Sequence, residues 1–189
     1  MTIEQYKAEI QQQLSPARAQ HSFNVAEEAV RLAKQYGADP QRAEVAGLLH
    51  DYMKETPAKQ QLQLLAQFGI IVQETERCAP KLLHAMTGAL MAREHFGVTD
   101  SAVLDAIRYH TTGRAGMTLL EKVIYIADFV SADRTFPGVE ELRACAHRSL
   151  DEAVFRGLTF TISDLASGSH PIHEDTLRAY NEYACAAAK

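Results

Sequence analysis

The chain has 189 residues, of which 47% are hydrophobic and 23% charged, and its formal net charge is −5. At about 150 residues per domain, this length favours one domain or one domain with a short extension. The apolar fraction is typical of a globular protein and argues against a disordered one. No apolar run approaches the roughly 18 residues of a membrane span. A net acidic chain also disfavours a broad nucleic-acid-binding surface.

The N-terminus and the cysteines bear on location. The first residues lack the basic and then apolar layout of a secretion signal, so we expect a cytoplasmic protein with no membrane partner. The three cysteines are odd in number and form no CxxC pair, which disfavours a disulfide framework and a thiolate zinc site. The sequence leaves the oligomeric state open, and a homodimer is allowed.

Helix start and stop signals recur along the first half of the chain. An N-cap residue followed by proline at the first helical position predicts three helix starts, at Ser15-Pro16, Asp39-Pro40 and Thr56-Pro57. Glycines are typical of helix ends, and three of them are expected to close helical runs: Gly37, Gly69 and Gly97. The last of these runs is predicted to begin near Pro80.

Helix signals also dominate the second half of the chain. Thr118 and Glu121 form a capping-box pattern, which predicts a helix from there to about Asp133. Gly138 and Gly168 bracket one long helical segment, and the last helix is predicted to begin at about His173. Only residues 68–72 resemble a short strand. We therefore predict one all-α domain over 1–189, with a core at about 16–135 and C-terminal helices at about 139–187 packed on it.

Several titratable residues are predicted to lie on the inner faces of these helices. His21, for example, shares a face with Val25, Ala29 and Leu32, at spacings of four, eight and eleven. The same reasoning applies to six residues on five helices: His21, His50, Asp51, His84, His110 and Asp128. The other four histidines have polar or loop neighbours and are expected at the surface: His95, His147, His170 and His173.

A shared metal centre is the most economical interpretation of these six inward residues. A lone inward histidine is more often a core residue bonded to a backbone carbonyl. A lone buried aspartate is often a cap or an ion-pair partner. Six together, with His50 and Asp51 adjacent, favour a metal site instead. Imidazole and carboxylate ligands without thiolate suit iron, manganese or zinc in a catalytic site.

The order of these residues resembles that of the HD-domain superfamily of metal-dependent phosphohydrolases. Within it, the segments around His21, His50 and His84 are similar to those of the bacterial YqeK family. The most specific segments are HTTGR at 110–114 and the ADxxxxxR pattern from Ala127 to Arg134. The resemblance spans about residues 5–185 and implies an HD-domain helical bundle. It departs from the family pattern at Ser131-Ala132, where a Glu-Pro pair is expected.

The resemblance implies symmetrical hydrolysis of diadenosine tetraphosphate to two ADP, with one or two iron ions as the usual metal. Manganese, zinc or another divalent ion is allowed. It implies four ligands of a primary metal: His21, His50, Asp51 and Asp128. Asp51 is able to bridge to a second metal, and His84 and His110 either complete that second metal or donate hydrogen bonds to phosphate. In the expected mechanism, a metal-bound hydroxide attacks one central phosphorus and ADP leaves.

Charged and polar residues beside the expected ligands are candidates for catalysis and nucleotide binding. Lys54 stands one helical turn after Asp51 and is the first candidate for a phosphate clamp, although a solvated lysine near a helix end is an equal alternative. Arginine matches phosphate oxygens well. The expected catalytic residues are Asp51, Lys54, His84 and His110. The expected nucleotide-binding residues are Arg18, Lys54, His84, His110, Thr111, Arg114, Arg134 and Ile172.

Three other functions fit the same residues. One is a different HD-type nucleotide phosphohydrolase, such as a nucleotide 5′-phosphatase, which would release phosphate from mononucleotides. Another is a non-catalytic module that senses ADP and metal without turnover. A purely structural role, with all six residues as satisfied core polar groups, is the fourth interpretation.

Overall fold

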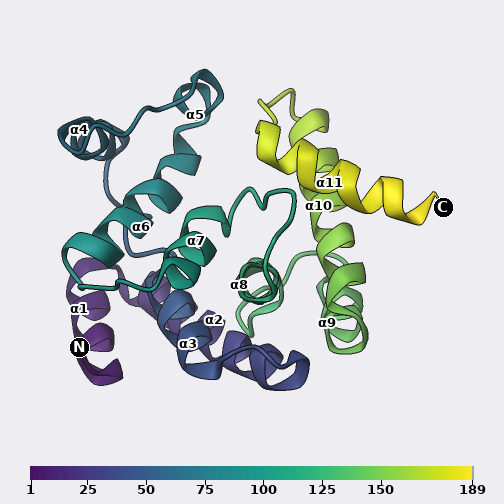
Figure 1. The fold of residues 1–189 in the computed structure, drawn as a ribbon, viewed down its shortest axis with the longest axis horizontal. Coiled ribbons are helices and arrows are strands. Elements are labelled where there is room, and N and C mark those ends of the chain that lie inside the picture. The colour runs from purple at the N-terminus through teal and green to yellow at the C-terminus, as the bar shows by residue number, and fades with distance from the viewer. Residues whose placement is uncertain (189) are drawn as a thin grey trace.

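A computed structural model describes residues 1–188, and its elements there are all helices (Figure 1). The prediction of an all-α fold is confirmed. The elements are α1 (Ile3–Gln13), α2 (Pro16–Tyr36), α3 (Pro40–Leu49), α4 (Ala58–Gln67), α5 (Glu74–Cys78), the 3-10 helix η1 (Pro80–Leu82), α6 (Leu83–Glu94), α7 (Ser101–Tyr109), α8 (Leu119–Val130), α9 (Val139–Arg148), α10 (Leu150–Ser167) and α11 (Glu174–Ala187).

Two of the three predicted N-caps form as expected. Ser15 caps α2, and the Asp39 carboxylate accepts hydrogen bonds from two backbone amides at the start of α3. The third prediction is wrong by one residue. Pro57 has an extended conformation (φ −56°, ψ 138°) and is itself the N-cap of α4, which has no side-chain cap. The Thr56 hydroxyl instead lies 3.9 Å from the sulfur of Met53.

Several helix limits differ from the predicted ones. The capping box at Thr118 is present, but α8 ends at Val130 because Ser131 has an extended backbone (ψ 155°). The segment between Gly138 and Gly168 is two helices, since Ser149 is extended (φ −152°) and its side chain starts α10 as a new N-cap. The first helix, α1, was not predicted, and residues 68–72 form a turn and coil.

The helices α2, α3, α7 and α8 pack against one another in the middle of the molecule. A Cβ atom on Gly47 would lie 2.7 Å from the Cα of Ala26, so glycine lets α3 approach the α2 backbone closely. Figure 1 shows α8 end-on between α7 and α10, and α10 packs on both α8 and α9. The larger of two clusters of buried apolar residues runs from Tyr6 to Ala179, and a smaller one joins α4 and α6 through Leu65, Val72, Leu83, Met86 and Leu90. The division into a core and a C-terminal extension within one domain stays a prediction.

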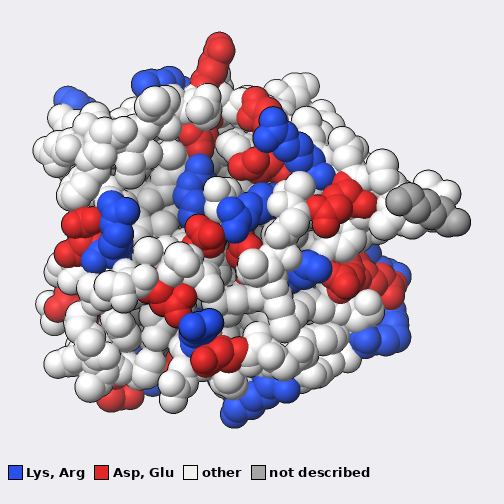
Figure 2. All heavy atoms as spheres, viewed as in Figure 1, with Lys and Arg blue, Asp and Glu red and all other residues white. Residues whose placement is uncertain are grey.

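The surface and the helices bear on possible partners. No helix among residues 1–188 is long and apolar enough to cross a membrane. On the face drawn in Figure 2, Lys and Arg are interspersed with Asp and Glu, and no continuous basic area is visible there. This mixture is consistent with the acidic net charge of −5.

Candidate metal centre

The six inward residues predicted from the sequence meet at one place. Three overlapping groups of them each bring ligand atoms within 4.8 Å of one another. The elements that carry them are α2 (His21), the turn after α3 (His50 and Asp51), the start of α6 (His84), the end of α7 (His110) and the last turn of α8 (Asp128). Five are buried, and the Asp128 side chain is 18% exposed. Their convergence fits a metal centre.

Backbone carbonyls hold three of the four imidazoles. In each case Nδ1 donates to the carbonyl oxygen three residues earlier: His50 to Gly47 (2.7 Å), His84 to Lys81 (2.6 Å) and His110 to Ile107 (2.7 Å). A carbonyl can only accept, so Nδ1 of each ring donates a proton to it and Nε2 is the nitrogen that faces the centre. Metal-ligating histidines are typically oriented in this way.

We call the group of Asp51 Oδ1, His84 and His110 the second half of the centre. Asp51 Oδ1 lies 3.1 Å from His84 Nε2 and 3.6 Å from His110 Nε2, and the two Nε2 atoms are 3.0 Å apart. Burial lowers the pKa of His84, which therefore stays neutral. Three lone-pair atoms so close together require a cation. The Lys54 ammonium lies 3.4 Å from Asp51 Oδ1 and 3.2 Å from His84 Nε2.

We call the group of Asp51 Oδ2, His21, His50 and Asp128 the first half of the centre. His50 Nε2 lies 3.5 Å from Asp51 Oδ2, and His21 Nε2 lies 3.0 Å from Asp128 Oδ1. His50 Nε2 is fully buried and has no hydrogen-bond partner among residues 1–188. Burial lowers the pKa of His50 to about 4, in spite of the nearby Asp51 and Asp128. A neutral, unpartnered and dry imidazole nitrogen fits a metal ligand.

His21 is held by a carboxylate that sequence reasoning missed. Its Nδ1 lies 2.8 Å from Asp133 Oδ2, and Asn24 donates to the other oxygen of Asp133 at 2.9 Å. Burial alone would lower the pKa of His21, but the bonds to Asp128 and Asp133 outweigh it and raise the pKa. No sequence motif marks Asp133 as a partner of His21. The polar residue Asn24, one helical turn after His21, was a weak sign that this face of α2 meets a polar group.

Both central carboxylates are ionised at neutral pH. Burial would raise the pKa of Asp51, but His50, His110, His84 and Lys54 hold it well below its usual range. Burial likewise opposes the ionisation of Asp128, yet the contacts with His21, His50 and Arg134 lower its pKa. The centre therefore offers two full negative charges, which suits a divalent cation.

Three predicted phosphate-binding cations reach this centre. Arg18 donates to Asp51 Oδ2 at 2.9 Å, and Lys54 contacts Asp51 Oδ1. Arg134 donates from Nε to the Asp128 backbone carbonyl at 2.7 Å and also bonds the Asp128 carboxylate. Lys54 arrives by a different route from the predicted one, because α3 ends at Leu49 and residues 50–54 form turns instead of a continuing helix.

A clamp outside the predicted site holds the loop after α8. The Arg143 guanidinium donates to the backbone carbonyl of Val130 at the end of α8 (2.9 Å) and to those of Ser131 (2.8 Å) and Arg134 (2.7 Å) in the loop. This loop carries both Asp133 and Arg134, so Arg143 positions a carboxylate and a cation of the first half. The Ser131 carbonyl is thus a structural contact at the point where the sequence departs from the family pattern.

Thr111 connects the second half of the centre to a cavity of about 330 Å³. Its hydroxyl lies 3.0 Å from His110 Nε2 and 3.4 Å from His84 Nε2, and the residue also lines the cavity. Pro171 and His173 line the same cavity, but Ile172 between them is half-buried and is not one of the lining residues.

Arg114, also predicted to bind nucleotide, makes its contacts elsewhere. Its Nε lies 2.6 Å from the buried carboxylate of Glu121, and Nη2 donates to Asp105 at 3.0 Å. The guanidinium also stacks over Tyr109, 4.2 Å from the ring centroid. These contacts join the loop after α7 to α8, and the nucleotide-binding role of Arg114 stays a prediction.

His173 differs from its predicted place at the surface. It is only 6% exposed, and its Nδ1 accepts a hydrogen bond from the backbone amide of Asp175, which caps α11. Its Nε2 faces the buried carboxylate of Glu76 at 3.6 Å. The polar neighbours in the sequence were misleading because a capping residue at a helix start can turn its ring into the protein.

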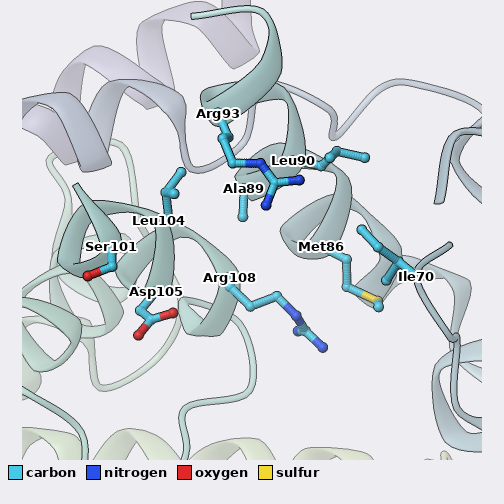
Figure 3. A pocket seen from close by; sticks show the side chains of 9 residues that line it. All are labelled: Ile70, Met86, Ala89, Leu90, Arg93, Ser101, Leu104, Asp105 and Arg108. Atoms are coloured by element: carbon cyan, nitrogen blue, oxygen red, sulfur yellow. The ribbon is translucent and has the colours of Figure 1, made fainter. Parts of the chain in front are cut away.

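A separate cavity of about 260 Å³ lies between α6 and α7. Figure 3 shows the side chains that line it, including Arg93 and Arg108. It shares no lining residue with the centre, so it adds nothing to the metal site.

The helical fold and the histidine-aspartate centre define a class of protein. The model of the HD domain family matches residues 18–133, which include all six inward residues. The chain therefore belongs to the HD domain family, and this class implies dependence on a divalent metal.

Its relatives narrow the class. The chain is 40% identical to a symmetrical bis(5′-nucleosyl)-tetraphosphatase of Bacillus subtilis, over 96% of this chain and 97% of that protein. It is 44% identical to a protein of the same name from Halalkalibacterium halodurans, over 89% and 90%. A solved structure from Clostridium acetobutylicum, described as a predicted HD superfamily hydrolase involved in NAD metabolism, superposes with a TM-score of 0.95 at 34% identity, covering 98% of each chain.

Proposed function

We propose that this protein hydrolyses diadenosine tetraphosphate symmetrically to two ADP. The observation that carries the proposal is the centre itself, in which four imidazoles and two ionised carboxylates meet beside three cations. The substrate is taken from the names of the relatives, which align with nearly the whole chain. The chain is thus an enzyme of phosphoanhydride hydrolysis.

The donor set suits iron in one or two positions, with manganese or zinc as alternatives. His21, His50, Asp51 and Asp128 would hold one ion, and His84 and His110, with Asp51 shared, would hold another. When bound, a divalent ion activates water at neutral pH and neutralises charge on phosphate oxygens. The absence of thiolate and the mixed imidazole and carboxylate donors support iron over a structural zinc.

The chain's own cations would hold the phosphates. Lys54 lies on the second half of the centre, whereas Arg18 and Arg134 lie on the first half, so positive charge stands on both sides of Asp51. A tetraphosphate laid across the centre would meet a cation at each end. The guanidinium forks suit phosphate oxygens, which become more negative as the bond breaks. In this proposal Asp51, Lys54, His84 and His110 contact the reacting groups.

The cavity beside Thr111 would take one adenosine. Its volume of about 330 Å³ is within the range of small-ligand sites. Its lining includes the apolar side chains of Leu82, Leu165 and Pro171. Thr111 itself reaches both Nε2 atoms of the second half, so a nucleoside there would place its first phosphate next to the centre.

Product analysis tests this function directly. Purified protein, loaded in turn with Fe²⁺, Mn²⁺ or Zn²⁺, is incubated with diadenosine tetraphosphate, and the nucleotides are resolved by anion-exchange chromatography. We expect ADP as the only product. ATP with AMP, or no turnover in protein that metal analysis shows to be fully loaded, would contradict the proposal.

The cellular setting follows from the same chemistry. We propose a cytoplasmic location, which the three free thiols at Cys78, Cys145 and Cys185 support. A small dinucleotide is the expected substrate and ADP the product, without a nucleic-acid or membrane partner. A homodimer stays a prediction.

A further inference from the structure

A second, smaller cavity opens on the other half of the centre. It has a volume of about 190 Å³ and is lined by Asp128, Phe129, Arg134, Phe136 and Phe160. Two of these residues belong to the site, since Asp128 is a candidate ligand and Arg134 bonds it. The other three are phenylalanines, which have no part in the chemistry described above.

The three rings pack against one another, and all three line the cavity beside the charged groups. The ring centroids of Phe136 and Phe160 are 5.2 Å apart, and those of Phe129 and Phe136 are 6.4 Å apart. Phe160 is 45% exposed, although a phenylalanine is normally largely buried. An exposed aromatic ring next to an arginine and a metal centre is typical of a place where a flat ligand ring stacks.

We propose that this aromatic cavity binds the second nucleoside of the dinucleotide substrate, with its base stacked on Phe160. The inference rests on the proposed function and extends it. The substrate has two identical nucleosides, and only one of them is assigned to the cavity beside Thr111. The cavity beside Arg134 lies at the opposite half of the centre, and the partly exposed ring of Phe160 lines it.

The two cavities share a wall. Phe160 and Thr161 are neighbours on α10, and each lines a different cavity. Successive residues of a helix point about 100° apart, so one helix presents a side chain to each nucleoside. The Arg143 clamp holds the loop that carries Arg134 and Phe136, which keeps the aromatic cavity in a fixed position relative to the centre.

Tryptophan fluorescence tests the stacking without turnover. The chain contains no tryptophan, so Phe160→Trp introduces a single reporter. Phe68→Trp is a matched control, because Phe68 is 46% exposed and Phe160 is 45% exposed, and Phe68 lines neither cavity. The probe is diadenosine tetraphosphate with a methylene group in place of the central bridging oxygen, added to the metal-loaded protein. We expect quenching in Phe160→Trp only, and none with inorganic tripolyphosphate.

Steady-state kinetics provides the second measurement. Stacking of one base on an aromatic ring contributes enough affinity that its loss corresponds to about a tenfold change. Phe160→Leu keeps an apolar side chain but removes the ring face. We therefore expect it to raise KM for diadenosine tetraphosphate about tenfold, while KM for adenosine 5′-tetraphosphate, which has one nucleoside, stays within twofold. Phe68→Leu should change neither value.

The outcomes separate this inference from the proposed function. If the wild-type protein does not form ADP from diadenosine tetraphosphate, the proposed function fails. If the wild type forms ADP but Phe160→Leu alters both substrates equally or neither, only the second nucleoside site is wrong. Equal quenching of the Phe68→Trp and Phe160→Trp variants would also overturn it.

Discussion

The two halves of the centre orient their imidazoles in partly different ways. In the second half, His84 and His110 are both held by backbone carbonyls three residues earlier. In the first half, His50 is held in the same way, but His21 is not. His21 depends on Asp133, a side chain from a loop more than a hundred residues away. Backbone contacts survive most substitutions, whereas the orientation of His21 depends on one particular side chain and on the loop that carries it. His21 is therefore the imidazole whose orientation we expect substitutions in the loop after α8 to disturb most.

Asp51 joins the two halves, and removing its charge should have the largest effect. Its two oxygens face different imidazole sets. We expect Asp51→Asn to lower kcat by about 10³-fold or more and to reduce the amount of metal bound at both halves, measured by elemental analysis. Asp151→Asn, an exposed aspartate whose side chain is 65% accessible, is the control. Full activity in Asp51→Asn would refute a shared carboxylate.

In metal-free protein, His50 and His21 should contribute to stability with opposite dependence on pH. Burial lowers the pKa of His50 from 6.5 to about 4. Between these two pH values the unfolded chain binds a proton at His50 and the folded state does not. Its contribution to stability is thus lost as the pH falls from about 6.5 to 4, by up to about 3 kcal/mol. The pKa of His21 is raised, so its contribution is present below pH 6.5 and is lost as the pH rises.

Chelated wild type and His50→Asn are compared by urea unfolding at several pH values. The wild type should lose more stability than the variant between pH 6.5 and 4. Parallel curves would show that His50 is not held neutral by burial.

The loop after α8 should be the next most sensitive feature. Arg143→Ala removes three hydrogen bonds to backbone carbonyls, and we expect it to lower the free energy of unfolding by about 2 kcal/mol. Chemical denaturation measures this. Arg148→Ala, on the same helix but 62% exposed, should change it by less than about 0.5 kcal/mol. Equal effects of the two variants would argue against a clamp.

Asp133→Asn should have the smallest effect and the most selective one. It leaves a polar group beside His21 but removes the carboxylate that orients the ring. Loss of such a partner weakens metal binding about tenfold. We expect one of two binding events in calorimetric metal titrations to weaken and the other to stay unchanged, with activity restored by excess metal. Weakening of both events would show that the halves are not independent.

The six candidate ligands were predictable because each has a signal in its own stretch of sequence. A histidine or aspartate on an apolar helical face is visible in the sequence, and the resemblance to the HD superfamily gave the six their common centre. All six do converge. The groups that orient them were not predictable in the same way, because a backbone carbonyl has no sequence signal and Asp133 meets His21 only in the folded chain.

Errors in the fold have the same origin. Ser149 interrupts a segment that lacks any glycine or proline at that point, and its extended backbone was therefore not predicted. His173 has polar neighbours, yet capping of α11 turns its ring inward. The role proposed for Phe160 depends on exposure, and a hydrophobic residue in a helix is normally expected in the core.

The Arg143 clamp also determines how short a working fragment can be. The HD family match ends at residue 133, while the side chain that holds the loop around that residue lies ten positions later, on α9. A protein cut at the end of the family match would keep every proposed metal ligand, but it would lose Arg134 and would leave Asp133 as its last residue, without the loop that Arg143 holds. We therefore expect the unit that folds and functions to be larger than the region matched by the family and to include α9.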